Sequence, residues 1–324
     1  MGPIARRQLI ARRDSSSNLN AKRTWNGSAG RTGSLRRRSG FGALEAARPR
    51  IMERFRFPFD IRVWMLDVWL MTATRQILGV RFFNGDVDEA VASMVRHGGF
   101  LVAPSGTCFA RLRDDEPYRR AMLAADLAIG DSGLMIVMWR LLRGEKVPRI
   151  SGLTYLKRLL AKLKDGETTQ IFWVLPNERA RQKLLDWSHR EAFTVKIDSC
   201  YVAPLYGVEI EDRHLLALIE GRRPAHVLIA VGAGTQEKLG YYLRENLSYR
   251  PAIHCTGAAL GFITGDQIVI PDWADHFYLG WLLRLVEQPQ IFIPRLTRTF
   301  EVPWLIWKYG ENLPPLGRRS EIEA

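Results

Sequence analysis

A glycine turn that follows an apolar segment carries the residues best suited to bind a ligand. The run HVLIAV, residues 226–231, is apolar almost throughout and predicts a parallel strand covered on both faces. Gly232 and Gly234 then allow a tight turn, and Gln236 and Glu237 open a helix whose first N–H groups favour anions. An amide and a carboxylate at this point can also bind the hydroxyl groups of a sugar.

The same turn has two other interpretations. In a structural one, Thr235 caps the helix while Gln236 and Glu237 face solvent. In the other, the turn belongs to a dinucleotide-binding fold, but that fingerprint needs a third glycine where Glu237 stands. No acidic residue ends a following strand at the usual distance either. We therefore expect no nicotinamide site and no cofactor.

The elements that must position this turn alternate along the chain. The expected strands are 100–103, 127–129, 169–175, 194–198, 226–231 and 252–255, and the expected helices are 86–97, 115–124, 134–142, 153–163, 178–190 and 212–220, with another after Gly234. This alternation, with short connections, predicts an α/β fold with a Rossmann-like, doubly wound, mostly parallel sheet. Ligands of such sheets bind beyond the carboxyl ends of the strands, so four turns are expected to meet in one cleft. They are residues 104–105, 130–131, 176–177 and 232–236.

The motifs that follow the glycine turn have a recognisable order. The chain reads GAGTQE, then GAALGFITG, IPDW and GWLLRL. These segments resemble the WecG/TagA/CpsF family of bacterial glycosyltransferases, whose members carry a Gly-x-x-x-Gln-Glu turn, a glycine-rich Phe-x-x-x-Gly segment, an Ala-Pro-x-Trp and a Glu-Trp-x-x-Arg-Leu helix. Towards the N-terminus, APSGTCF resembles the family's Thr-Pro-Asn turn, and ADLAIGD resembles its Ala-Asp-Leu strand. The resemblance covers roughly residues 75 to 310.

Asp131 is the candidate catalytic residue that the resemblance implies. Transfer of a sugar from a nucleotide diphosphate to a hydroxyl requires a base that accepts the proton, and a partly desolvated carboxylate at a strand end can serve. The structural alternative is an aspartate that caps the helix beginning near Ser132 and Gly133. Asp126, which enters the same strand, is expected to be a structural cap or turn residue.

The resemblance also implies substrate-binding positions. Arginines bind diphosphates through a planar fork, although a surface arginine is more commonly only solvated. The expected substrate-binding residues are Pro104, Ser105, Thr107, Arg149, Gly152, Gly232, Gln236, Glu237, Arg284, Arg295 and Arg298.

The chain departs from the family's pattern at five positions. Ala103 and Ser105 replace the threonine and asparagine of the Thr-Pro-Asn turn, Thr154 replaces an aspartate, Val269 an arginine and Gly280 a glutamate. These changes leave the expected fold intact, but they leave open the identity of donor and acceptor, and activity itself.

No metal site is expected. Asp86-Val87-Asp88 matches the Asp-x-Asp motif with which many glycosyltransferases hold a divalent ion, yet it precedes an apolar-periodic run where helix-capping carboxylates belong. The three cysteines and six histidines lack ligand spacing, and the cysteines are expected to be free thiols. Arginines and helix N-terminal amides are then expected to stabilise the leaving diphosphate.

The positive charge is concentrated at the N-terminus. Residues 1–50 hold twelve Lys and Arg against Asp14 and Glu45, so they carry +10 of the net +13. Residues 1–51 lack apolar periodicity and are expected to form a disordered basic extension. Three interpretations are left open. The segment binds anionic lipid headgroups, it binds nucleic acid, or it is translated sequence upstream of a true start at Met52.

The C-terminal part differs in character from the rest. Phe292, Leu296, Phe300 and Trp304 recur at four-residue intervals among arginines, a pattern that suits either core packing or a helix lying among lipid headgroups. We expect an α/β glycosyltransferase domain at 52–274 and a basic aromatic, membrane-associating helical appendage at 275–324. No run of 18 apolar residues exists to span a membrane.

The resemblance implies an inverting, metal-independent transferase. It would move a sugar from a UDP-sugar to a polyprenyl-diphosphate-linked glycan acceptor in surface or exopolysaccharide biosynthesis, as a peripheral protein on the inner face of the cytoplasmic membrane. Self-association is left open. One alternative is a catalytically silent nucleotide-sugar-binding assembly partner. A nucleic-acid-binding protein that acts through its basic tail is disfavoured, because the remaining residues carry only +3 and contain no basic helix or aromatic-basic RNA motif, so we expect no specific nucleic acid partner.

Overall fold

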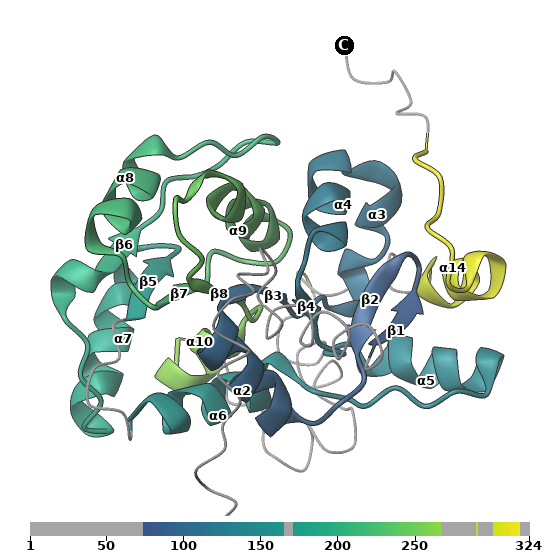
Figure 1. The fold of residues 1–324 in the computed structure, drawn as a ribbon, viewed down its shortest axis with the longest axis horizontal. Helices are drawn as coiled ribbons and strands as arrows, with labels where there is room; N and C mark the ends of the chain where they lie inside the picture. Colours follow the sequence, from purple (N-terminus) through teal and green to yellow (C-terminus); the bar gives the residue numbers. More distant parts are fainter. Residues whose placement is uncertain (1–73, 165–170, 267–289, 291–300, 318–324) are drawn as a thin grey trace, which may run out of the picture. The chain divides into compact units, whose positions relative to one another are not determined.

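Short apolar strands pair into one sheet that organises the protein (Figure 1). The computed structural model describes residues 74–164, 171–266, 290 and 301–317. Within them the strands are β1 (Thr74–Ile77), β2 (Val80–Phe83), β3 (Gly99–Val102), β4 (Leu127–Ala128), β5 (Ile171–Leu175), β6 (Cys200–Val202), β7 (His226–Ile229) and β8 (Ala252–Cys255). Their order across the sheet is β1-β2-β4-β3-β8-β7-β5-β6, and every pair is parallel except β1 with β2.

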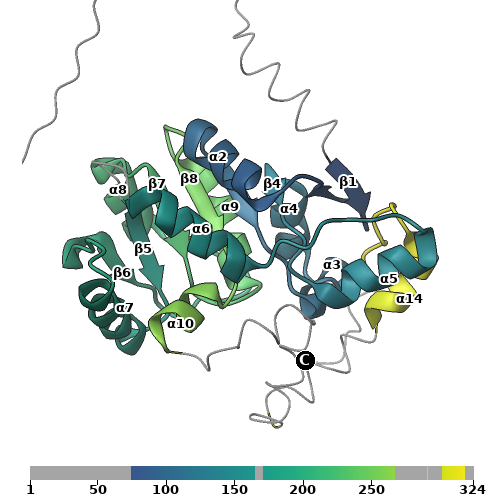
Figure 2. The same cartoon turned by 90° about the horizontal axis from the view of Figure 1, so that it is seen from below.

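Helices cover both faces of this sheet (Figures 1 and 2). Side chains alternate between two cores along each strand, so that Phe100 and Val102 face one core while Leu101 faces the other. Helices α4, α8 and α9 cover the first core and α2, α6, α7 and α10 the second. The helices are α2 (Val87–His97), α3 (Arg111–Asp114), α4 (Glu116–Leu123), α5 (Gly133–Arg143), α6 (Gly152–Lys164), α7 (Glu178–Arg190), α8 (Arg213–Arg222), α9 (Thr235–Asn246), α10 (Ala259–Thr264) and α14 (Glu301–Tyr309), with 3₁₀ turns at Gly106–Cys108 and Ile197–Ser199.

The expected α/β class, with a mostly parallel doubly wound sheet, is confirmed. The strand expected at 194–198 is wrong, because residues 197–199 form a 3₁₀ turn and the strand that pairs with β5 is Cys200–Val202. Phe193 and Val195 are apolar because they pack on the core from a loop, and Phe193 lies 5.4 Å from the Trp187 ring. The alternation of apolar residues in 194–198 therefore reflects packing on the core and not strand pairing.

The antiparallel hairpin of β1 and β2 was not expected from the sequence. Its two central residues, Leu78 and Gly79, have φ of 50° and 83°, and Asn-Gly would be the usual signal for such a turn. The C-terminal segment supports the hairpin from outside: Leu78 N–H donates to Gly310 O at 2.9 Å, and Gly79 N–H donates to Glu311 O at 2.8 Å. The turn depends on residues far away in the sequence, so local patterns could not identify it.

Helix α14 packs against α5 and completes the core beside the hairpin. Val302, Leu305 and Ile306 are fully buried, whereas Trp304 and Trp307 are 41% and 67% exposed. Within the described chain no helix is both long and apolar enough to cross a membrane. The expected domain boundaries at 51 and 274 fall outside the described residues, as do Phe292, Leu296 and Phe300 of the aromatic stripe.

A chain of three buried polar side chains crosses the sheet from β7 to α6. Tyr155 Oη lies 3.1 Å from His254 Nδ1, and His254 Nε2 lies 3.1 Å from His226 Nδ1. Burial lowers the pKa of His226 to about 4, and burial together with the charge of His226 lowers the pKa of His254 well below its ordinary value. Both imidazoles are therefore neutral in the folded protein at neutral pH.

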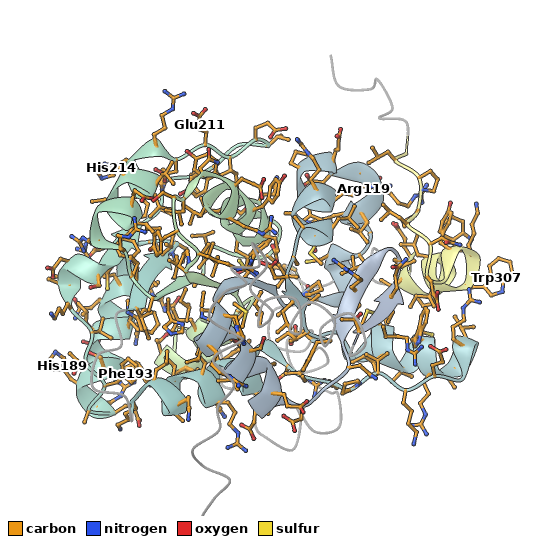
Figure 3. The ribbon with its side chains drawn as sticks, viewed as in Figure 1. Arg119, His189, Phe193, Glu211, His214 and Trp307 are labelled. Atoms are coloured by element: carbon orange, nitrogen blue, oxygen red, sulfur yellow. The ribbon has the colours of Figure 1, made fainter. Side chains whose placement is uncertain are left out.

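These depressed pKa values predict acid destabilisation. A histidine with a lowered folded pKa stabilises the fold fully above about pH 6.5, and its contribution is lost as the pH falls from there towards about 4. We expect the free energy of unfolding, measured by urea titration, to fall by about 3 kcal/mol over this window through His226 alone. His226→Asn should flatten the pH dependence. His189→Asn, on an exposed histidine of α7 (Figure 3), should leave it unchanged.

Candidate active site

Four neighbouring strands end level with one another at the carboxyl edge of the sheet. The register aligns Ala128, Val102, Cys255 and Ile229 on β4, β3, β8 and β7. Since neighbouring strands lie about 4.8 Å apart, these ends form a row roughly 14 Å long. The loops that follow these strands carry most of the expected site residues, so the structure brings those residues to one edge, as the fold type predicts.

Asp131 follows β4 and is partly exposed at this edge. Its Oδ1 accepts a hydrogen bond from Gly152 N–H at 2.8 Å, across to the first residue of α6. The alternative in which Asp131 caps the next helix is wrong, because Ser132 is the N-cap of α5 and its Oγ accepts from Met135 N–H at 3.3 Å. Asp131 is thus oriented by a separate helix, through the N–H of its first residue.

Gly152 allows α6 to approach β8 closely. A Cβ at this position would lie 2.5 Å from Thr256 O and 3.6 Å from the Ala103 Cβ. No residue other than glycine fits without moving the helix. Gly152, to which the family resemblance assigns substrate binding, therefore also fixes the hydrogen bond to Asp131.

The glycine turn after β7 agrees with neither interpretation of Gln236 and Glu237 in full. Gly234, with φ of 91°, is the N-cap of α9, and its N–H donates to Glu237 Oε2 at 2.6 Å. Gln236 Nε2 donates to Glu237 Oε1 at 3.0 Å, and both side chains are fully buried. Thr235 is not the cap and neither side chain faces solvent. Burial raises the pKa of Glu237, although these hydrogen bonds act in the opposite direction.

The loop after β3 lies beside this turn. Pro104 is buried, and Ser105 Oγ lies 3.2 Å from the thiol of Cys108, whose pKa is raised by burial and then by the charge of Glu237. Cys255 at the end of β8 donates through its thiol to Gln236 O at 3.1 Å. The loop after β3, the end of β8 and the start of α9 therefore form one continuous region.

The sequence analysis missed Arg111 at this place. Arg111 begins α3, and its guanidinium lies directly against Gly234, where a Cβ would sit within bonding distance of the guanidinium nitrogen. Arg111 lies outside the segments that carry the family resemblance, so only its position shortly after Ser105 could have indicated a place at this site. This arginine adds a positive charge beside the start of α9.

The remaining expected positions are only partly described. Arg149 is partly exposed, and its neighbour Ile150 donates through N–H to Gly130 O at 3.2 Å, so Arg149 lies next to the turn that carries Asp131. Thr154 is exposed, with its hydroxyl 2.9 Å from Ser151 Oγ. Arg284, Arg295, Arg298, Val269, Gly280 and the side chain of Thr107 lie outside the described residues.

Asp86-Val87-Asp88 has the capping role expected of it. Asp86 Oδ1 accepts from Glu89 N–H at 2.8 Å, and Glu89 Oε2 accepts from Asp86 N–H at 3.0 Å, which completes a capping box. Asp88 lies 3.7 Å from Arg158. In the part of the chain that the structure describes, no three His, Cys, Asp or Glu side chains gather as a metal-binding group.

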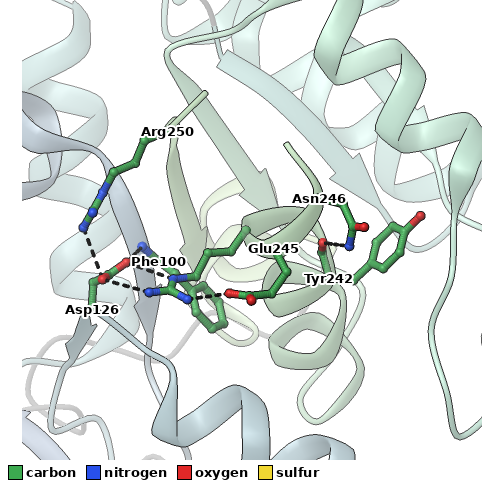
Figure 4. Close-up of polar contacts among 7 residues, drawn as sticks. Phe100, Asp126, Tyr242, Glu245, Asn246 and Arg250 are labelled. Carbon is green, nitrogen blue, oxygen red and sulfur yellow. Dashed lines mark hydrogen bonds and ion pairs between the residues drawn. The ribbon is translucent and has the colours of Figure 1, made fainter. Parts of the chain in front are cut away.

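A cavity of about 360 Å³ lies at the opposite, amino edge of the sheet, lined in part by Gly99, Asp126, Arg244 and Arg250. Asp126 Oδ2 accepts from Phe100 N–H at 2.8 Å, and the carboxylate also contacts Arg244 and Arg250 at 3.4 and 3.2 Å (Figure 4). Asp126 thus has the structural role expected of it, and both arginines already have a carboxylate partner.

The fold and this site define an α/β protein with a ligand site beyond the carboxyl ends of a doubly wound sheet. The chain belongs to the WecG/TagA/CpsF family of glycosyl transferases, whose family model matches residues 75–314. The comparison with curated proteins finds no match.

The packing around Gly152 predicts a sensitive position. Gly152→Ala places a methyl group 2.5 Å from Thr256 O, which should displace α6 and lengthen the hydrogen bond to Asp131. We expect the free energy of unfolding to fall by about 1–3 kcal/mol and transferase activity to fall at least about tenfold. The matched control is Gly221→Ala in α8, where nothing lies within 4 Å of the added methyl group. Equal effects of the two substitutions would contradict this role for Gly152.

Proposed function

We propose that this glycosyltransferase is inverting and metal-independent and transfers a sugar from a UDP-sugar to a polyprenyl-diphosphate-linked acceptor, in the synthesis of a cell-envelope polysaccharide. The observation that carries the proposal is the placement of Asp131 on the same edge of the sheet as the glycine turn. Its carboxylate lies at the end of β4, oriented by Gly152 N–H, on the same edge as the N-terminus of α9. A base and an anion-binding helix start are the two groups that such a transfer requires.

The proposed reaction is a single displacement. The carboxylate of Asp131 accepts the proton of the acceptor hydroxyl, whose oxygen attacks the anomeric carbon from the face opposite the diphosphate. The hydrogen bond from the N-terminus of α6 orients the carboxylate, and the N-terminal N–H groups of α9 favour the negative charge that develops on the leaving diphosphate. Alignment of attacking and leaving groups supplies a large part of the acceleration.

Substitution of Asp131 tests this role directly. Asp131→Asn should lower acceptor-dependent UDP release about 10²- to 10⁴-fold, because the amide cannot accept the proton, while UDP binding is retained. The assay uses a panel of UDP-sugars with a polyprenyl-diphosphate-linked sugar, with and without EDTA. Asp88→Asn is the control with the same change of charge, since Asp88 belongs to the Asp-x-Asp sequence that caps α2.

The outcomes separate the proposal from its alternatives. Loss of activity in EDTA, or in Asp88→Asn, would contradict metal independence. A wild-type protein that binds UDP-sugars but releases no UDP with any acceptor would instead support a catalytically silent assembly partner. The departures from the family pattern at Ala103 and Ser105 would then be the first candidates to explain the loss of activity.

We also propose that the protein binds peripherally to the inner face of the cytoplasmic membrane, where a lipid-linked acceptor resides. Two packed helices support this proposal, because α5 starts two residues after Asp131 and α14 packs on it. Both helices expose apolar and basic side chains, a combination suited to anionic headgroups. These residues are Val137, Arg140, Leu141, Leu142 and Arg143 on α5, and Trp304, Trp307 and Lys308 on α14.

Trp307, which projects from α14 (Figure 3), provides the test of membrane binding. Trp307→Ser should weaken sedimentation with vesicles that contain anionic lipid by about tenfold, because an indole ring at the interface is lost. Leu205→Ser removes a fully exposed apolar side chain from a different loop and should have no effect. Equal vesicle binding by both variants and the wild type would exclude α14 from the membrane contact.

A further inference from the structure

The guanidinium of Arg111 lies directly against the glycine turn, and the proposed reaction does not use it. Arg111 is partly exposed, and it forms no hydrogen bond and no ion pair within 4.0 Å with any residue that the structure describes. It nevertheless has a fixed place against the backbone of Gly234.

Gly234 is shaped to accommodate this arginine. Its φ of 91° already favours glycine, and any side chain there would overlap the Arg111 guanidinium. Gly232, with φ of 100°, is exposed and has open space around the position of a Cβ. The turn therefore holds the guanidinium on one side and leaves its backbone accessible on the other.

This placement is electrostatically unfavourable without an anion. The N-terminus of a helix carries a partial positive charge, so a cation beside it is repelled. Glu237 is the carboxylate whose charge interacts with Arg111, but its two oxygens accept hydrogen bonds from Gly234 N–H and Gln236 Nε2, and burial raises its pKa. A guanidinium and the start of a twelve-residue helix thus converge on one point.

Gln236 gives a second, independent indication of a ligand. Its side chain is fully buried in the first turn of α9, and Oε1 has no hydrogen-bond partner in the described structure although Nε2 bonds to Glu237. A buried acceptor without a donor is costly, and native proteins rarely leave one. A hydroxyl hydrogen of a nucleotide-sugar held at this turn would satisfy it, whereas the phosphate oxygens, which only accept, would not.

We infer that Arg111 and the Gly232–Gln236 turn form a binding subsite for the diphosphate of the nucleotide-sugar donor. The guanidinium fork can bind two phosphate oxygens while the first N–H groups of α9 bind others. This inference rests on the proposed function for the identity of the donor, and it adds a residue outside the segments that carry the family resemblance. Arg111 binds the group that leaves, so it stabilises the charge that develops there.

Calorimetric titration of the full-length protein with UDP, uridine and inorganic pyrophosphate tests the subsite. Arg111→Gln should weaken binding of UDP and of pyrophosphate about 10- to 100-fold, and leave uridine binding unchanged because uridine lacks phosphate. Arg111→Lys keeps the charge but loses the planar guanidinium fork. Its affinities for UDP and pyrophosphate should lie between those of the wild type and of Arg111→Gln. Arg120→Gln, on an exposed arginine of α4, is the control with the same change of charge and should bind all three as the wild type does.

The outcomes distinguish this inference from the proposed function. If Arg111→Gln binds UDP as tightly as the wild type, the subsite is overturned while a UDP-sugar donor stands. If uridine binding weakens equally, Arg111 supports the fold of the pocket and the subsite is again overturned. If the wild type binds pyrophosphate through Arg111 but binds no UDP-sugar, the subsite stands and the proposed donor is refuted. A wild type that binds neither pyrophosphate nor UDP overturns the subsite.

Discussion

The hydrogen bond from Gly152 N–H to Asp131 Oδ1 is the interaction on which the site depends. It joins the loop after β4 to the start of α6, and α6 can reach that loop only because Gly152 lets the helix lie against Thr256 O at the end of β8. The ends of β4 and β8 are therefore coupled through one backbone position. The buried Tyr155 hydroxyl, one turn along α6, reaches His254 on β8 and fixes the same helix a second time. The orientation of the carboxylate is thus a property of sheet packing and not of a flexible loop.

The balance of charge at the carboxyl edge explains why the site suits an anionic ligand. Two helices, α6 and α9, start there, and one of their N-termini is already occupied by Asp131. At the other, the buried carboxyl of Glu237 accepts hydrogen bonds from the backbone of Gly234 and of Glu237 itself, and it is the acidic group of the first turn of α9. Arg111 and the helix start both contribute positive potential at this point, beside the single carboxyl of Glu237. A doubly negative diphosphate would complete this arrangement, whereas a cation would not.

Sequence patterns could identify what depends on local periodicity and on capping. The parallel strands β3, β4, β5, β7 and β8, the cap at Asp86 and the turn that ends in Asp131 follow from patterns within a few residues. The structure adds what depends on neighbours remote in the sequence. Glu237 reads as an exposed polar residue at a helix start, yet the packing of α9 against β3 and β8 buries it completely. The role of Arg111 likewise arises from contact with a turn more than a hundred residues away.

The hairpin of β1 and β2 has a consequence for how the protein is made. Its turn at Leu78 and Gly79 is bonded to Gly310 O and Glu311 O, about 230 residues later in the chain. A ribosome adds about 5–20 residues per second. The C-terminal residues that bond to this turn are therefore synthesised on the order of 10–50 seconds after the hairpin. The nascent chain carries an unfinished, pairing-competent strand during that interval. This border of the sheet is therefore completed only near the end of biosynthesis.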